Sequence, residues 1–104
     1  NAGAGYSSAK AAIIALTKNI AMQYAGRGIR CNAVCPGPVA TPIMDGRNED
    51  KFATEFMAIT DRHADCSVPA STAEEQAYVI AFFASDLAVT INGEAIVTDG
   101  GRCL

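Results

Sequence analysis

The chain has 104 residues, half of them hydrophobic and 18% charged, which is enough apolar content for one small domain with a packed core. This composition argues against a disordered chain. The net charge is −3 and no basic run is present, which argues against a nucleic-acid partner because phosphate contacts need clustered Lys and Arg side chains.

The cysteines show neither a CxxC pair nor the histidine spacing of a zinc site, so the sequence predicts no metal centre. Scattered cysteines are typical of free thiols in a reducing compartment. No signal peptide and no apolar run of membrane-spanning length is visible. We therefore expect a soluble, cytoplasmic protein without a membrane partner.

The first predicted element is an alanine-rich helix over residues 7–25. Its apolar residues recur at intervals of three and four, and the stripe is broad, which favours burial against a sheet on one side and another helix on the other. Gly26 and Gly28 are expected to end the helix, because glycine accepts the left-handed C-terminal conformation at little cost. The apolar positions are Ala9, Ala12, Ile13, Ala15, Leu16, Ile20, Ala21 and Ala25.

A short strand is predicted next, over residues 29–34. The proline-rich stretch that begins at Pro36 should stop it, because proline has no N–H to donate to a β-ladder. Residues 38–48 are expected to form a loop. Asn48 can then cap a short amphipathic helix from residue 49 to about residue 59.

Two overlapping capping boxes, Ser71 with Glu74 and Thr72 with Glu75, predict the start of a further helix that runs to about Ser85. Asn92 and Gly93 predict a turn before a second strand over residues 94–98. The helix is expected to bury Ala77, Ile80, Phe83 and Ala84.

The alternation of helices and strands is typical of an α/β fold with a parallel sheet. A parallel pair of strands is normally buried on both faces and continued at its edges. Two strands therefore do not make a stable sheet by themselves, and we expect further strands on the N-terminal side.

Tyr6 and Lys10 are spaced so that both project from the same face at the start of the first helix. A free tyrosine titrates near pH 10, so proton transfer near neutral pH requires a nearby cation that stabilises the phenolate. The pair could then act as a general acid or base with its supporting lysine. The alternative is a solvated helix start in which the two residues meet by chance.

Three stretches of the chain resemble the short-chain dehydrogenase/reductase family. The first is Tyr-Ser-Ser-Ala-Lys at residues 6–10, and the second is the run Gly-Ile-Arg-Cys-Asn-Ala-Val-Cys-Pro-Gly-Pro-Val-Ala-Thr-Pro at residues 28–42. The third is Ile-Asn-Gly-Glu-Ala-Ile-Val-Thr-Asp-Gly-Gly at residues 91–101. The resemblance implies the C-terminal part of a Rossmann-type doubly wound parallel sheet, in the order helix, strand, helix, helix, strand.

The resemblance also implies roles for individual residues. Tyr6 resembles the family's catalytic acid/base, and Lys10 resembles the lysine that makes the tyrosine more acidic and binds the nicotinamide ribose. The segment that resembles the family's holder of the nicotinamide end of NAD or NADP contains Pro36, Gly37, Val39 and Thr41. In it, the Val39 backbone would face the carboxamide, and the Thr41 hydroxyl would reach the amide or the pyrophosphate.

Residues 42–65 resemble the family's substrate-binding lid. Its candidates for contacts with an apolar substrate are Met44, Phe52, Phe56 and Met57. Ordinary packing against the sheet is the competing interpretation of these four side chains.

The family's glycine-rich pyrophosphate loop and its catalytic serine have no counterpart in this sequence, so residues 1–104 are predicted to be the C-terminal half of a single NAD(P)-binding domain. The parent enzyme would transfer a hydride between NAD(P)H and a small-molecule carbonyl or alcohol, with 3-oxoacyl thioester reduction as the leading possibility. The family also implies a homodimer or homotetramer. The isolated chain is expected to be inactive, and the alternative function is a non-catalytic assembly module.

Overall fold

The computed structural model describes residues 3–42, 58 and 61–103. In these ranges it contains helix α1 (Ala4–Tyr24), strand β1 (Ala33–Pro36), helix α3 (Ala73–Ala84) and strand β2 (Ala95–Thr98). Short 3-10 turns follow the two helices at Ala25–Arg27 and Asp86–Ala88. The helix predicted over residues 49–59 lies almost wholly outside the described residues.

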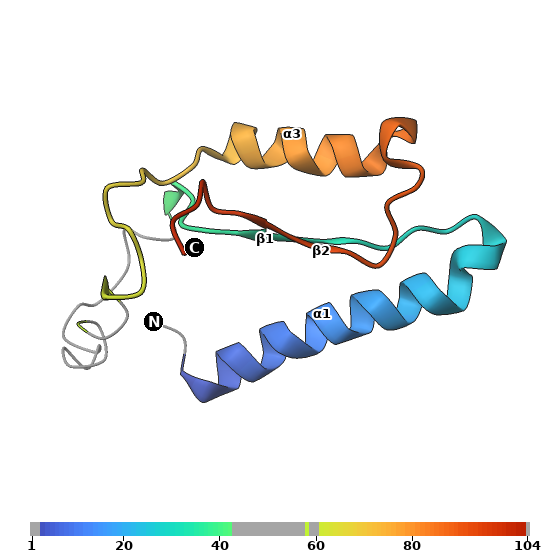
Figure 1. Ribbon diagram of the computed structural model, residues 1–104, viewed down its shortest axis with the longest axis horizontal. Coiled ribbons are helices and arrows are strands. Elements are labelled where there is room, and N and C mark those ends of the chain that lie inside the picture. Colours follow the sequence, from blue (N-terminus) through green and yellow to red (C-terminus); the bar gives the residue numbers. More distant parts are fainter. Residues whose placement is uncertain (1–2, 43–57, 59–60, 104) are drawn as a thin grey trace.

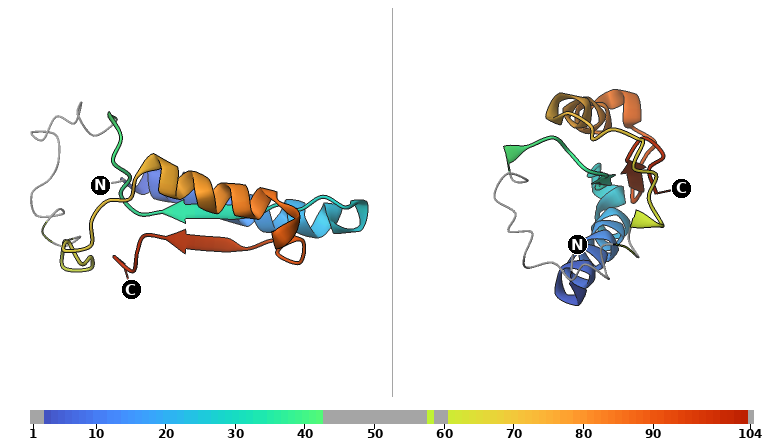
Figure 2. Two further views of the ribbon diagram at one scale, coloured as in Figure 1. Left: turned by 90° about the horizontal axis from the view of Figure 1, so that it is seen from above. Right: turned by 90° about the vertical axis from the view of Figure 1, so that its left-hand side faces the viewer.

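The two strands lie between the two helices, with α3 over one face and α1 below the other (Figure 1). They pair in parallel, from Ala33 opposite Ala95 to Pro36 opposite Thr98. Both helices run opposite to the strands, so the start of α1, the start of α3 and the carboxyl ends of both strands lie at one end of the molecule (Figure 2). This confirms the predicted α/β fold class with its parallel strands.

The first strand was predicted too early in the sequence. It spans Ala33–Pro36 rather than residues 29–34, and it ends at Pro36, in the proline-rich stretch that was expected to stop it. A proline fits the end of a strand where its missing N–H is not needed by the ladder. The residues before the strand are extended but are held by side chains instead of by β2.

Three side chains tie this extended segment to the loop before β2. The Arg30 guanidinium donates to the carbonyl groups of Ser85, Ala88 and Ile91 at 3.0, 3.0 and 3.4 Å. The Asn92 side chain accepts from the Cys31 N–H at 2.8 Å, while the Asn32 side chain bonds Ile91 and Glu94. Side-chain amides and a guanidinium thus supplement the two backbone bonds at this end of the sheet, from the Gly93 N–H to the Cys31 carbonyl at 2.9 Å and from the Ala33 N–H to the Glu94 carbonyl at 2.8 Å.

Helix α1 begins three residues earlier than predicted, so Tyr6 lies inside its first turn. The helix ends at Tyr24, and Gly28 caps the 3-10 turn that follows it, with a φ of 73° in the left-handed conformation that favours glycine. Gly26, also expected to end the helix, lies inside that turn and its φ is not positive.

Helix α3 starts as predicted: Thr72 accepts from the Glu75 N–H at 3.2 Å, and the Glu75 carboxylate accepts from the Thr72 N–H at 2.8 Å. The second predicted capping box, at Ser71, does not form.

The predicted buried faces are largely wrong. Among the described residues only Thr17, Ala21 and Ala88 are buried, whereas Leu16 and Ile80 are 57% and 56% exposed. The radius of gyration is 16.1 Å, against about 13 Å for a compact domain of this length. The described residues therefore form an open layer rather than a closed core, because each helix has a covering partner on one side only.

Candidate active site

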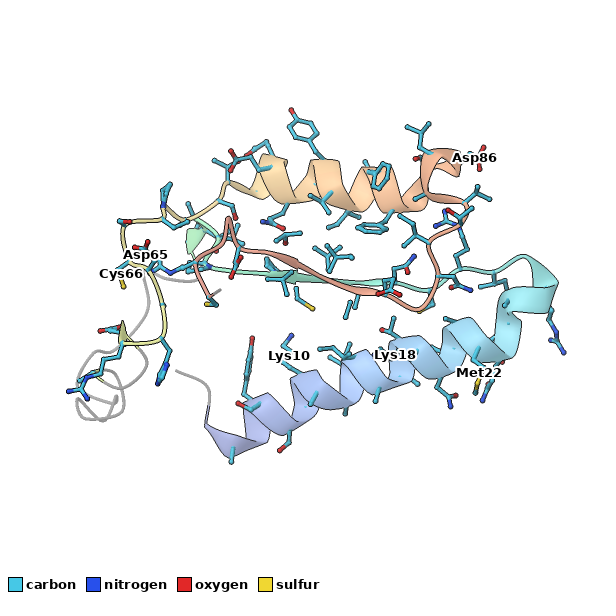
Figure 3. The ribbon with its side chains drawn as sticks, viewed as in Figure 1. Lys10, Lys18, Met22, Asp65, Cys66 and Asp86 are labelled. Atoms are coloured by element: carbon cyan, nitrogen blue, oxygen red, sulfur yellow. The ribbon has the colours of Figure 1, made fainter. Side chains whose placement is uncertain are left out.

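Tyr6 and Lys10 lie together on the first turns of α1. The Lys10 ammonium group is 5.3 Å from the centre of the Tyr6 ring, as the helical spacing requires. Lys10 points from α1 toward the side where the strands lie (Figure 3). Tyr6 is 59% exposed in the described structure, so its hydroxyl is open to a ligand.

The bend after β1 is packed directly against the turn after β2. A Cβ atom at Gly37 would lie 2.7 Å from the Asp99 Cβ and 3.1 Å from its Cα, which is closer than atoms can approach without a shift. The φ of Gly37 is not positive. The glycine is therefore required here for space rather than for an unusual backbone conformation.

The Asp99 side chain stabilises the turn after β2, which packs against the bend at Gly37. Its carboxylate accepts from the N–H groups of Gly101 and Cys103, at 2.9 Å each, and these bonds lower the pKa of Asp99 from its ordinary value. A second aspartate nearby behaves alike: Ser67 donates to Asp65 through its hydroxyl and its N–H, which lowers the pKa of Asp65. Both carboxylates therefore act as turn-forming acceptors.

Val39 forms a parallel bridge with Ser71. The bridge uses the Ser71 N–H, which donates to the Pro38 carbonyl at 3.0 Å, and the Ala40 N–H, which donates to the Ser71 carbonyl at 2.8 Å. Because neighbouring residues of an extended chain direct their backbone groups to opposite sides, the N–H and C=O of Val39 face away from Ser71. One donor and one acceptor are thus presented together on the free side of the segment.

The structure thus brings together part of the predicted site. Tyr6 and Lys10 form one group, and Pro36, Gly37 and Val39 form a continuous segment at the same end of the molecule. Thr41 continues that segment and is half-buried. The four predicted lid contacts, Met44, Phe52, Phe56 and Met57, lie outside the described residues.

Sequence reasoning missed the residues that hold the segment. Asp99 appeared only as part of the third family-like stretch, and Ser71 only as a helix cap. Gln76 was not singled out, although it shares a helical face with Val79 and Phe83 and is the polar member of that set. A polar residue at that spacing was the available signal.

In the described part of the chain, no three His, Cys, Asp or Glu side chains come together in a way that could hold a metal ion. The same residues include no helix that is both long and apolar enough to cross a membrane.

Comparison with known proteins places the chain in a family. The family model described as enoyl-(acyl carrier protein) reductase matches residues 1–102. Dehydrogenase/reductase SDR family member 6 of Aquarana catesbeiana is 40% identical over 104 residues, which cover 95% of this chain and 40% of that protein. The chain belongs to the short-chain dehydrogenase/reductase family. This confirms the resemblance that the three motif stretches carry.

Other members of this oxidoreductase family give the same result. The 3beta-hydroxysteroid dehydrogenase 2 of Eggerthella lenta is 41% identical over 99 residues, covering 95% of this chain and 37% of that enzyme. A solved structure of 4-hydroxyisoleucine dehydrogenase complexed with NADH superposes with a TM-score of 0.72 at 29% identity, over 94% of this chain and 39% of that one. The chain thus spans about two fifths of the length of the short-chain dehydrogenases that it matches.

Proposed function

We propose that this chain is the C-terminal half of an NAD(P)-dependent dehydrogenase, and that it supplies the proton-transfer pair and the nicotinamide-holding segment. The proposal rests on one observation above all. The Lys10 ammonium group lies 5.3 Å from the Tyr6 ring at the end of the molecule where the strands end. Ligands of open α/β sheets bind outside the carboxyl ends of their strands.

In the proposed mechanism, Tyr6 transfers the proton and Lys10 supports it. The Tyr6 hydroxyl donates its proton to the oxygen of a carbonyl substrate as that oxygen gains negative charge, and it accepts the proton in the reverse direction. The Lys10 ammonium stabilises the phenolate by Coulomb attraction, and its N–H groups can also donate to ribose hydroxyls. The bound NAD(P)H supplies the hydride.

The segment after β1 fits the amide end of a nicotinamide ring. A carboxamide carries both N–H donors and a carbonyl acceptor, and the backbone of Val39 presents the complementary acceptor and donor on one side. The Thr41 hydroxyl, two residues on, would reach the amide or the pyrophosphate. The NADH complex of one related structure supports a nicotinamide dinucleotide, and we propose NAD or NADP as the cofactor.

The substrate class is a small-molecule carbonyl or alcohol. A solved structure of a 3-oxoacyl-[acyl-carrier protein] reductase from Brucella melitensis is 28% identical to this chain with a TM-score of 0.75, which supports a 3-oxoacyl thioester first. One related enzyme is by name a hydroxysteroid dehydrogenase, which makes a sterol-like alcohol the second choice. We propose that the chain alone is inactive, because dinucleotide affinity depends strongly on a phosphate site at a helix N-terminus that none of its motifs supplies.

The Tyr6→Phe variant of the full-length protein tests the proton-transfer role. General acid–base catalysis contributes about 10²–10⁴-fold, so kcat should fall at least about a hundredfold while the KM for the dinucleotide stays constant. Tyr78→Phe is the matched control, since Tyr78 is 73% exposed on α3, and it should keep full activity. Undiminished turnover by Tyr6→Phe would remove the basis of the proposal.

A further inference from the structure

A single side chain on α3 links the end of β2 to the segment that begins at the end of β1. Gln76 donates from Nε2 to the Thr98 carbonyl and to the Ser71 hydroxyl, at 2.9 Å each. Its Oε1 accepts from the Thr98 hydroxyl at 2.7 Å. Both amide protons of Gln76 and its oxygen are therefore engaged.

Ser71 carries this linkage to the segment after β1. Its hydroxyl, which accepts from Gln76, donates to the Pro38 carbonyl at 3.3 Å, and its backbone forms the bridge with Val39. The path from Thr98 through Gln76 and Ser71 thus ends on the two residues that flank Val39. It lines an open cavity of about 650 Å³ between α3 and the strand ends.

The half-buried position of Gln76 indicates that its hydrogen bonds help to fix the local structure. Gln76 is half-buried on the face of α3 that also carries the half-buried Val79 and Phe83, where side chains lie between α3 and the strands (Figure 3). An apolar residue would suffice there for packing alone. A polar group in such a position is favourable only when its hydrogen bonds are complete, and a complete set then fixes one arrangement.

We propose that Gln76 is a positioning residue for dinucleotide binding. Through Ser71 it fixes the backbone from Pro38 to Ala40, and it thereby orients the N–H and C=O of Val39 toward the nicotinamide carboxamide. The orientation of Val39 toward the carboxamide rests on the proposed function, because only there does the Val39 backbone contact a ligand. The fixing of the segment by Gln76 and Ser71 does not depend on that function.

Loss of the Gln76 hydrogen bonds should affect the dinucleotide and not the carbonyl substrate. Gln76 forms no hydrogen bond with α1, where Tyr6 and Lys10 lie. Its replacement should therefore weaken dinucleotide binding without moving the groups that contact the carbonyl substrate. If Gln76 only stabilised the fold, its replacement would change the KM values of both substrates together, or neither of them.

The test compares Gln76→Leu with Gln23→Leu in the full-length protein. Gln23 donates to Asn19 at 2.8 Å on the exposed side of α1, so this control removes one glutamine hydrogen bond that does not reach the segment. Thr98→Val is a second, milder variant, since it removes only the hydroxyl that donates to Gln76. Two quantities are measured: hydrogen exchange of the Ser71 and Ala40 amides, and KM for the dinucleotide and the carbonyl substrate separately.

We expect Gln76→Leu to raise both exchange rates and the dinucleotide KM about tenfold, as the loss of one or two ordinary hydrogen bonds implies. The KM for the carbonyl substrate should stay within about twofold, and Thr98→Val should shift the same quantities in the same direction by less. Gln23→Leu should change none of them.

Unchanged exchange at Ser71 and Ala40 in both variants would overturn the linkage, whatever the protein's activity. Faster exchange with an equal rise in both KM values would reduce Gln76 to a structural residue and also overturn the proposal. Failure of the proposed function would be seen elsewhere, in a Tyr6→Phe variant that keeps its turnover.

Discussion

The tyrosine–lysine pair shows how far a sequence reaches at the scale of single residues. Four residues of helix place two side chains on the same face, so their proximity followed from spacing alone and the structure gives it as 5.3 Å. No packing partner was needed to predict it. The spacing could not predict which distant segment lies at the same end of the molecule as the pair.

Gly37 shows the opposite case. Its place in the motif predicts a role beside the cofactor, whereas its immediate neighbour is Asp99, which is 62 residues later in the chain. The bend after β1 and the turn after β2 touch because the two strands are in register, with Pro36 opposite Thr98. A glycine is the residue that permits this approach.

Gly37→Ala should therefore lower the free energy of unfolding by about 1–3 kcal/mol, because the added methyl group has no room beside Asp99. The measurement is the urea midpoint of unfolding at constant m-value.

Gly26→Ala is the matched control for this substitution. A Cβ at Gly26 meets no atom within 4 Å and its φ is not positive, so this change should be neutral or slightly stabilising. Equal midpoints for the two variants would show that the contact with Asp99 is easily relieved.

At the scale of elements, helix α3 was predicted with the right start and a partly wrong inner face. Its capping residues act locally, within one turn, and the box at Thr72 and Glu75 forms as the sequence indicates. The half-buried face carries Gln76, Val79 and Phe83. Of the four residues predicted there only Phe83 is half-buried, and the other three are exposed: Ala77, Ile80 and Ala84. Helix α3 carries apolar residues on more than one side, so periodicity alone does not predict which face turns toward the strands. The hydrogen bonds of Gln76 identify that face.

Thr72→Ala should destabilise α3 by about 1 kcal/mol, because the Glu75 N–H loses its acceptor. Thr72→Ser retains that oxygen and should keep nearly all of the stability. Both are measured by thermal unfolding, and helix content near the start of α3 is followed by exchange of the Glu75 amide. A Thr72→Ala variant as stable as Thr72→Ser would mean that water replaces the cap without cost.

At the scale of the whole molecule, the described residues expose apolar surface on both outer sides. Ile13 and Leu16 on α1, Leu87 after α3 and Val97 on β2 are 51%, 57%, 83% and 63% exposed. Such surface favours association with further protein. The alternative function, a non-catalytic assembly module, also requires exposed apolar surface, because in it this part of the fold forms contacts between subunits and takes no part in catalysis.

We predict that the 104-residue chain self-associates at micromolar concentration, through these surfaces and through the outer edges of β1 and β2, which pair with no further strand within residues 3–42 and 61–103. Light scattering measures the mass directly. Leu16→Gln should reduce association, whereas Lys18→Gln, at another exposed position of α1, should leave it unchanged. A folded monomer at that concentration would contradict the prediction.

Local sequence was enough to predict what depends on near neighbours: helices α1 and α3, the capping box at Thr72 and Glu75, the parallel α/β alternation, the family motifs, and the tyrosine beside its lysine. These follow from hydrogen bonds and side-chain spacing within a few residues. Long-range packing was needed to set the bounds of β1, the inward face of α3, and the roles of Asp99, Ser71 and Gln76 in holding the segment after β1. Apart from the bond between Gln76 and Ser71, which are five residues apart, those contacts join residues 22 to 62 positions apart. No local pattern encodes which distant backbone will lie beside such residues.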